Sequence, residues 1–214
     1  MRITSFGHSC LLVETDRARL LVDPGTYSSG YDSLSGIDAV VVTHQHPDHV
    51  DTDALGGLLA SNDGAELLAE PEATTALKGF PAVAFPAGAD RSFGDLTVAA
   101  VGGEHALIHD LLPRIGNVGL LIAEKGGPTL FHPGDSYAYA PAGVDVLAFP
   151  LNAPWARVSE TLDFLRRVSA PVELPIHDGL LNDTGRAMYL MHASKFGPAD
   201  SHVRDIHDRA PYDV

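Results

Sequence analysis

The chain contains the stretch Ile37-Asp38-Ala39-Val40-Val41-Val42, followed at once by Thr43-His44-Gln45-His46-Pro47-Asp48-His49. The first half is a short apolar run rich in β-branched residues, which is typical of a buried strand. Pro47 keeps the residue before it out of helical geometry, so the second half is predicted to be a loop at the strand end. Loops held by a rigid strand are common places for binding groups.

This loop carries four potential metal ligands within six residues: His44, His46, Asp48 and His49. In an extended chain, His44 and His46 point the same way. Asp48 and His49 follow at the predicted start of a helix. A single tetrahedral site does not draw four nitrogen and oxygen ligands from one short loop, so the pattern predicts two adjacent ions.

Two ions need further ligands, and these are expected at the ends of other strands. The candidates share one context, an acid or imidazole just beyond a predicted strand and near Gly or Pro: Asp23, His105, Asp135 and His177. His109 lies in the same predicted loop as His105, so it is an alternative ligand or a substrate contact.

Alternating apolar runs and turns predict an α+β chain. Strands are expected over residues 2–6, 10–14, 19–22, 38–42, 96–101, 118–123, 129–131, 144–149 and 172–174. Helices are expected from 51 or 52 to about 59, 71 to about 77, 157–168 and 183–196. The first three strands are separated only by short turns, which predicts an antiparallel meander.

The length, composition and net charge of the chain limit the classes of function that it can have. The 214 residues suit one domain over residues 1–214, and the single Cys10 excludes an internal disulfide. No apolar run approaches a membrane span and no apolar stretch follows Met1, so a cytoplasmic protein without membrane contact is expected. The net charge of -14 disfavours nucleic acid as a partner, whereas 11 histidines favour metal binding. A homo-oligomer remains compatible with the sequence.

The order Asp23, His-x-His-x-Asp-His, His105, Asp135, His177 resembles the metallo-β-lactamase superfamily. The segments 6–10 (Phe-Gly-His-Ser-Cys) and 175–179 (Pro-Ile-His-Asp-Gly) resemble its branch containing ascorbate-6-phosphate lactonase. The resemblance implies an αββα four-layer sandwich, in which two mixed β-sheets pack face to face with helices outside. It also implies a ligand distribution: His44, His46 and His105 on one ion, Asp48, His49 and His177 on the other, and Asp135 bridging both. In the same resemblance, Asp23 binds no metal and orients the ligand loop by hydrogen bonds, as metal-bound imidazoles usually require.

The predicted function is that of a dinuclear, zinc-dependent hydrolase, with Mn or Fe as alternative metals. A hydroxide between the ions attacks a small ester, lactone or phosphoester, and Asp48 also accepts a proton as a catalytic residue. Asp135 occupies a position that is cysteine in true β-lactamases, which argues against antibiotic hydrolysis. The alternatives are an iron-dependent oxidoreductase with the same ligands, a non-catalytic metal-binding protein and, less favoured, a nuclease.

Several other side chains have two possible roles each. His8 and Trp155 either pack in the interior or contact the substrate. Arg114, Arg157 and Lys195 are anion contacts or surface charges. The remaining histidines are expected to be structural or to lie on the surface: His132 in the first case and His192, His202 and His207 in the second.

Overall fold

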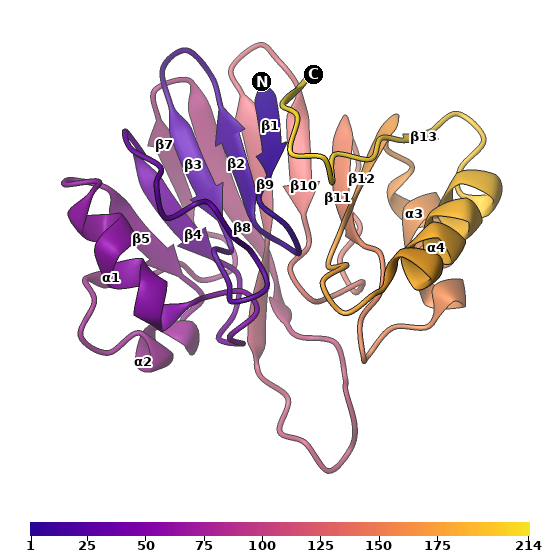
Figure 1. Cartoon of the computed structure of the whole chain (residues 1–214), viewed down its shortest axis with the longest axis horizontal. Coiled ribbons are helices and arrows are strands. Elements are labelled where there is room, and N and C mark those ends of the chain that lie inside the picture. The colour runs from indigo at the N-terminus through magenta and orange to yellow at the C-terminus, as the bar shows by residue number, and fades with distance from the viewer.

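The computed structural model describes residues 1–214, and its helices and sheets form four layers. Helices α1 (Thr52–Ala60) and α2 (Ala73–Ala76) cover one sheet, and α3 (Val158–Val168) and α4 (Asp183–Phe196) cover the other (Figure 1). The predicted αββα sandwich of two mixed β-sheets is therefore confirmed. None of the four helices has the length and apolar character needed to span a membrane.

The first sheet has the order β14-β1-β2-β3-β4-β5-β6. Its strands are β1 (Arg2–Ser5), β2 (Leu11–Glu14), β3 (Arg19–Val22), β4 (Ala39–Val42), β5 (Glu66–Ala69), β6 (Ala82–Ala84) and β14 (Tyr212–Asp213). Strands β1 to β3 pair antiparallel, which confirms the meander, and β3 to β6 pair parallel. Parallel pairing brings the carboxyl ends of β3 and β4 to the same edge.

The second sheet has the order β13-β12-β11-β10-β9-β8-β7. Its strands are β7 (Asp90–Phe93), β8 (Leu96–Glu104), β9 (Gly116–Glu124), β10 (Thr129–His132), β11 (Val146–Pro150), β12 (Val172–Ile176) and β13 (His202–Val203). Strands β7 to β10 pair antiparallel and β10 to β13 parallel, so β8, β10 and β12 all run in one direction.

Strand β4 shows why the sandwich holds together. Its side chains alternate, with Ala39 and Val41 in the core between the sheets and Val40 and Val42 in the core beneath α1. All four residues are fully buried. A strand buried on both faces has no polar positions, which explains the uninterrupted apolar run in the sequence.

The sequence did not indicate five of the strands, and one helix is shorter than expected. β5, β6 and β7 are three or four residues long, and β13 and β14 have two residues each. Of these five, β6, β7, β13 and β14 are the edge strands of the two sheets, and a short edge strand carries little buried apolar pattern. α2 spans only Ala73–Ala76, because the predicted helix over 71–77 forms a single turn between β5 and β6.

Candidate metal centre

Five strand ends deliver the predicted ligand residues to one edge of the sandwich. Asp23 directly follows β3, and the loop His44–His49 follows β4. His105 directly follows β8, Asp135 comes three residues after β10, and His177 directly follows β12. These side chains, distant in sequence, meet because all five strands point their carboxyl ends the same way.

The side chains form two groups, in each of which the potential ligand atoms lie within 4.8 Å of one another. One group is His44, His46, His105 and Asp135, and the other is His8, Asp48, His49 and His177. The grouping follows the ligand distribution implied by the family resemblance with two differences: His8 is added to the second group, and Asp135 belongs to the first group alone. Every member is buried except His46 and Asp48, which are half-buried.

Three histidines present a nitrogen to the centre while the other nitrogen is occupied. Nδ1 of His49 lies 2.7 Å from Asp23 Oδ2, that of His105 2.6 Å from the Ala106 carbonyl, and that of His177 2.7 Å from the Asn152 carbonyl. Each Nδ1 therefore donates a proton outward. Nε2 of all three is buried without a hydrogen-bond partner, so three lone pairs converge on the centre.

Asp23 organises both ends of the His44–His49 loop. Its Oδ2 accepts hydrogen bonds from His49 Nδ1 and from the Thr43 hydroxyl, and its Oδ1 accepts one from the Thr43 backbone N–H. The Thr43 oxygen lies 3.1 Å from His44 Nδ1 and can accept its proton. His44 Nε2 then faces His46 Nδ1 at 3.1 Å, and two nitrogens this close require a proton or a cation between them.

Asp135 lies between the two groups. Its Oδ2 lies 3.1 Å from His177 Nε2 and 3.5 Å from His105 Nε2, and its Oδ1 lies 3.1 Å from His49 Nε2. The Oδ1 contact has the distance but not the angles of a hydrogen bond, and Oδ1 has no other partner. Asn117 fixes the Asp135 backbone by accepting its N–H at 2.9 Å. Asp135 is therefore placed to contact ions in both groups.

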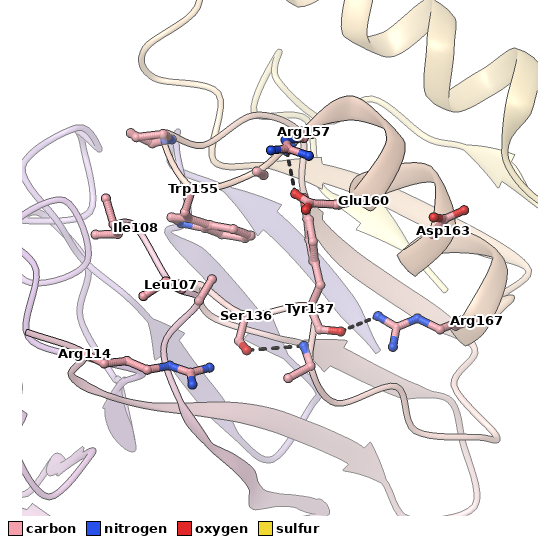
Figure 2. Close-up of a pocket in the computed structure, with 14 residues that line it drawn as sticks. Leu107, Ile108, Arg114, Ser136, Tyr137, Trp155, Arg157, Glu160, Asp163 and Arg167 are labelled. Carbon is pink, nitrogen blue, oxygen red and sulfur yellow. Dashed lines mark hydrogen bonds between the residues drawn. The ribbon is translucent and has the colours of Figure 1, made fainter. Parts of the chain in front are cut away.

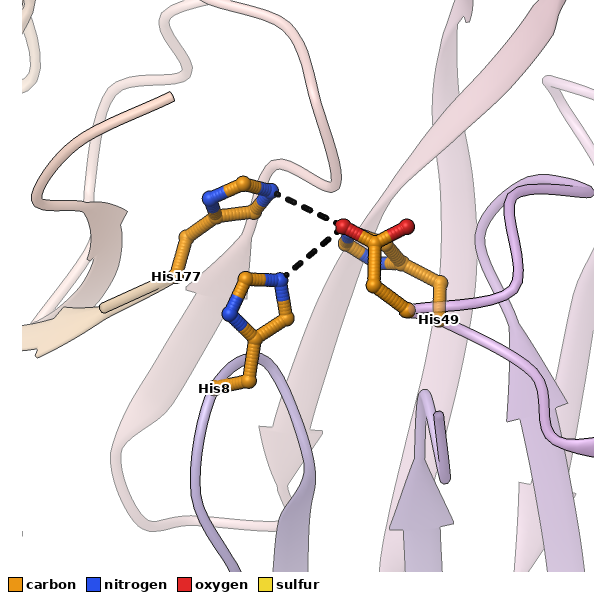
Figure 3. Close-up of side chains that lie close together, drawn as sticks. His8, His49 and His177 are labelled. Atoms are coloured by element: carbon orange, nitrogen blue, oxygen red, sulfur yellow. Dashed lines mark hydrogen bonds and ion pairs between the residues drawn. The ribbon is translucent and has the colours of Figure 1, made fainter. Parts of the chain in front are cut away.

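His8 differs from His49, His105 and His177 in which nitrogen carries the proton. The Gly179 backbone N–H donates to His8 Nδ1 at 3.1 Å, so in the neutral ring the proton is on Nε2. Nε2 donates it to Asp48 Oδ2 at 3.2 Å. In Figure 3, His8 and His177 point from separate loops toward the same carboxylate. A protonated Nε2 cannot bind a metal, so His8 orients Asp48.

The loops that bring these residues together have strained or unusually close backbones. His8, Asp23 and His177 have φ values of 50°, 47° and 58°, in the left-handed region that non-glycine residues rarely adopt. At Gly25, an added Cβ would lie 1.8 Å from the Asp48 carbonyl oxygen, so only glycine lets that segment pass the metal-site loop. Strain of this kind is maintained mainly at functional sites.

The electrostatics of the centre favour bound cations. Burial opposes charge on His49, yet the carboxylates of Asp135 and Asp23 raise its pKa well above the usual value. Burial likewise opposes charge on Asp135, yet His49 and His177 hold its pKa well below the usual value. Burial lowers the pKa of His44 and adds to the effect of the neighbouring histidines. The ionised carboxylates therefore favour positive charge between them, which His49 carries as a proton and which a bound metal ion can supply in its place.

Some of the other residues singled out in the sequence lie at the centre and others do not. Trp155 donates its indole N–H to Asp135 Oδ2 at 2.8 Å, which places it in the centre. His109 is exposed and belongs to neither group, whereas His105 is buried in one. His132 is buried between the Ser9 carbonyl and the Gly134 N–H and is structural, as expected.

The remaining candidates lie farther from the centre. Arg114 and Arg157 line a cavity beside it. Lys195 lies over the Phe196 ring on α4 and lines neither that cavity nor the centre. His202 and His207 are exposed and His192 is half-buried on α4.

Apart from Asp23, the sequence did not reveal the residues that orient the candidate ligands. These are Thr43, Asn117 and Asn152, the last through its backbone carbonyl. Polar residues of this kind occur throughout any chain, so composition carried no signal for them. For His8, the only signal was its place in the Phe-Gly-His-Ser-Cys segment.

Comparison with known proteins identifies the family of this chain. The family model described as Beta-lactamase superfamily domain matches residues 2–177. The chain belongs to this superfamily. Among other members, it is 43% identical to Protein Rv0786c of Mycobacterium tuberculosis, over 95% of this chain and 96% of the relative.

Two further superfamily relatives carry functional names. A UPF0173 metal-dependent hydrolase of Carboxydothermus hydrogenoformans is 27% identical over 88% of this chain and 93% of its own. The solved structure of Igni18, a metallo hydrolase from Ignicoccus hospitalis, superposes with a TM-score of 0.73 at 22% identity. That match covers 100% of this chain and 98% of Igni18, and shows the shared fold. The lactonase branch stays a prediction.

Proposed function

We propose that this superfamily member is a hydrolase that binds two divalent metal ions, most simply zinc, and cleaves a small ester, lactone or phosphoester. One ion is assigned to His44, His46 and His105, and the other to Asp48, His49 and His177. Asp135 is assigned to both ions because its carboxylate contacts His105 of one group and His49 and His177 of the other. Membership of the superfamily and the names of two relatives support a metal-dependent hydrolytic activity.

The observation that carries the proposal is the set of buried atoms without partners. Nε2 of His49, His105 and His177 and Oδ1 of Asp135 point into one small space, and none has a hydrogen-bond partner. Burying such atoms unpaired costs about 1–3 kcal/mol each. Hydrogen bonds on the far side of each ring fix its tautomer, as ligating histidines require. The donor set therefore fits divalent ions.

The ions, when bound, supply Lewis-acid polarisation of a carbonyl or phosphoryl group and make a water molecule acidic near neutral pH. The side chain of Asp48 is 21% exposed, whereas those of the surrounding histidines are buried, so Asp48 faces the entrance. The hydrogen bond from His8, with the charge of His49, outweighs burial and lowers the pKa of Asp48 to about 2. Asp48 is thus an ionised carboxylate, placed to take a proton from the attacking water.

The test is metal-dependent turnover of a broad substrate panel. The protein, loaded with zinc, manganese or iron(II), is assayed against generic lactones, esters and bis-p-nitrophenyl phosphate. We expect turnover that a chelator abolishes and that Asp48→Ala lowers by about 10²–10³-fold, the scale seen when a group acting on the reacting charge is removed. Asp53→Ala, which removes an exposed carboxylate nearby on α1, is the matched control and keeps its activity.

Two results would overturn the proposal. One is inactivity of the fully metal-loaded protein across the whole panel. The other is oxygen consumption by the iron-loaded protein without hydrolysis, which would favour the oxidoreductase alternative.

A further inference from the structure

Two cavities meet at the metal centre. The smaller, of about 200 Å³, is lined by the ligand residues His46, Asp48, His105, Asp135 and His177. The larger, of about 740 Å³, lies beside it between the β8–β9 loop and α3. Ile108, Pro154 and Trp155 line both. A molecule that reacts in the smaller cavity therefore extends past Trp155 into the larger one.

The wall near Trp155 is flat and apolar. The indole is fixed at its N–H by Asp135 and packs edge-on against the Tyr137 ring, with centroids 4.8 Å apart. Leu107 and Ile108 face it from the β8–β9 loop (Figure 2) and are 52% and 40% exposed. These partly exposed apolar side chains beside a rigid indole form a surface for an apolar, planar group.

The charges of the larger cavity differ in sign from those of the whole chain. Three arginines and two acids line it, Arg114, Arg157, Arg167, Glu160 and Asp163, for a balance of 3 − 2 = +1. The chain as a whole carries -14. The local positive balance favours an anionic group over a neutral one, and a balance of one charge is neutralised by a single carboxylate.

Among these arginines, only Arg157 has a free guanidinium. Arg114 pairs with Glu104 at 3.0 Å and donates to the His105 carbonyl, and Arg167 donates to the Tyr137 carbonyl. The Arg157 side chain has no hydrogen bond or ion pair. Figure 2 shows it above the indole, with Asp163 and Arg167 farther along α3.

Neither acid forms an ion pair with this guanidinium. Glu160 accepts a hydrogen bond from the Arg157 backbone N–H at 2.8 Å, which caps α3. Asp163 precedes Arg167 by four residues, the helical spacing at which opposite charges offset each other. The cavity also lies at the N-terminus of α3, an 11-residue helix whose first amides add positive potential.

We propose that the larger cavity binds a planar apolar part of the substrate that ends in a single carboxylate. Arg157 holds the carboxylate, Trp155 supports the apolar part, and the bond to be cleaved lies in the smaller cavity. This inference names the substrate class of the proposed hydrolase and rests on that function for the reacting bond. The binding step itself requires no turnover, so it can be tested separately.

The test uses Trp155, the single tryptophan of the chain, as a fluorescent reporter inside the cavity. The zinc-loaded protein is titrated with 3-phenylpropionate, with the neutral 3-phenylpropan-1-ol and with the dianion phenyl phosphate. We expect the carboxylate to bind about tenfold more tightly than the alcohol, as for a charge-assisted hydrogen bond weakened by partial exposure. Phenyl phosphate is expected to bind no more tightly than 3-phenylpropionate.

Two variants locate the anion. Arg157→Gln should reduce the preference for the carboxylate over the alcohol to about twofold or less. Arg91→Gln makes the same charge change on exposed β7, where it lines neither cavity, and should leave the preference intact. Equal binding of carboxylate and alcohol by the wild type would overturn the inference. A preference retained in Arg157→Gln would also overturn it, because the metal centre would then hold the carboxylate.

Different results would overturn the proposed hydrolase and the proposed substrate class. Metal-dependent hydrolysis without any carboxylate preference would remove only the substrate class. A carboxylate preference lost in Arg157→Gln, in a protein inactive on the whole panel, would leave the binding site and remove the hydrolase.

Discussion

The two sheets contribute candidate ligands to the site in different ways. The first sheet supplies the loop His44–His49, in which four candidate ligands are adjacent, and Asp23 holds that loop through side-chain hydrogen bonds. The second sheet supplies His105, Asp135 and His177 singly, each from a different strand end, and mostly backbone carbonyls hold them. The larger cavity is built entirely from second-sheet loops and α3.

We infer from this difference that the first sheet mainly serves metal binding and the second mainly serves substrate selection. A dense loop tied to one buried carboxylate sets the geometry of the metal centre. Isolated residues on long connections complete that centre and leave room beside it for a substrate. We therefore expect changes near Asp23 to alter metal binding, and changes around Arg157 and Trp155 to alter selectivity.

The largest expected effect concerns Asp135, the one residue between both groups. Asp135→Ala should remove metal from both, and activity should fall by about 10³-fold, the upper range for loss of a group acting on reacting charge. Metal analysis and kcat/KM measure this. Asp63→Asn, a change at an exposed carboxylate between α1 and β5, should leave both unchanged. Normal metal content in Asp135→Ala would show that the two sheets do not share the site.

Asp23 tests the role of the first sheet alone. In Asp23→Asn, an amide replaces a carboxylate that accepts from His49, the Thr43 hydroxyl and the Thr43 N–H, so one donor must lose its partner. Metal affinity should fall about 10–100-fold, as for other residues that orient ligands. Competition with a chromogenic chelator measures it. An unchanged affinity would mean that the loop orients itself without Asp23.

His8 tests the link between the sheets, since its ring contacts Asp48 of the first and Gly179 of the second. His8→Phe removes the hydrogen bond to Asp48, so affinity for one of the two ions should fall about tenfold, the scale of a hydrogen bond to a charged group. His8→Gln keeps an N–H donor and should restore most of that loss. Equal loss in both variants would make His8 a ligand instead.

Glu173 provides a contrast away from the site, within β12 of the second sheet. It is buried, Oε1 has no partner, and burial raises its pKa from 4.5 to about 7. The folded protein thus holds this proton more tightly than the unfolded chain, and the protein loses stability as pH rises from about 4.5 to about 7.

Glu173→Gln should therefore stabilise the protein above neutral pH by about 1 kcal/mol, because a buried amide costs less than a buried carboxylate. The effect should nearly vanish at acidic pH. Urea unfolding at both pH values measures it. Equal effects at the two pH values would mean that Glu173 ionises normally.

Prediction from the sequence succeeded for the parts of the molecule with repeated local signals. Strand β4 was identifiable because burial on both faces leaves an unbroken apolar run. The candidate ligand loop was identifiable because four residues with metal-binding side chains fall within six positions. His105, Asp135 and His177 were identifiable only as polar residues after strands. Whether they meet depends on sheet order, which no local pattern encodes.

The remaining features arise from contacts that the sequence does not mark. Asn117 and Asn152 act through bonds to residues 18 and 25 positions away. The role of His8 depends on which nitrogen faces Gly179, 171 residues later. The larger cavity is formed by irregular loops whose path has no periodic signal, so its position could not be predicted.

The central claim is a two-ion centre shared between the sheets, and the most direct test is to count and locate the ions. The protein is loaded with zinc, its metal content is determined by mass spectrometry, and the ions are located by anomalous scattering from a crystal. We predict two ions per chain, one contacting His44, His46 and His105, the other Asp48, His49 and His177, with Asp135 on both and His8 on neither. No ion, a single ion, or a centre that excludes Asp135 would contradict the account.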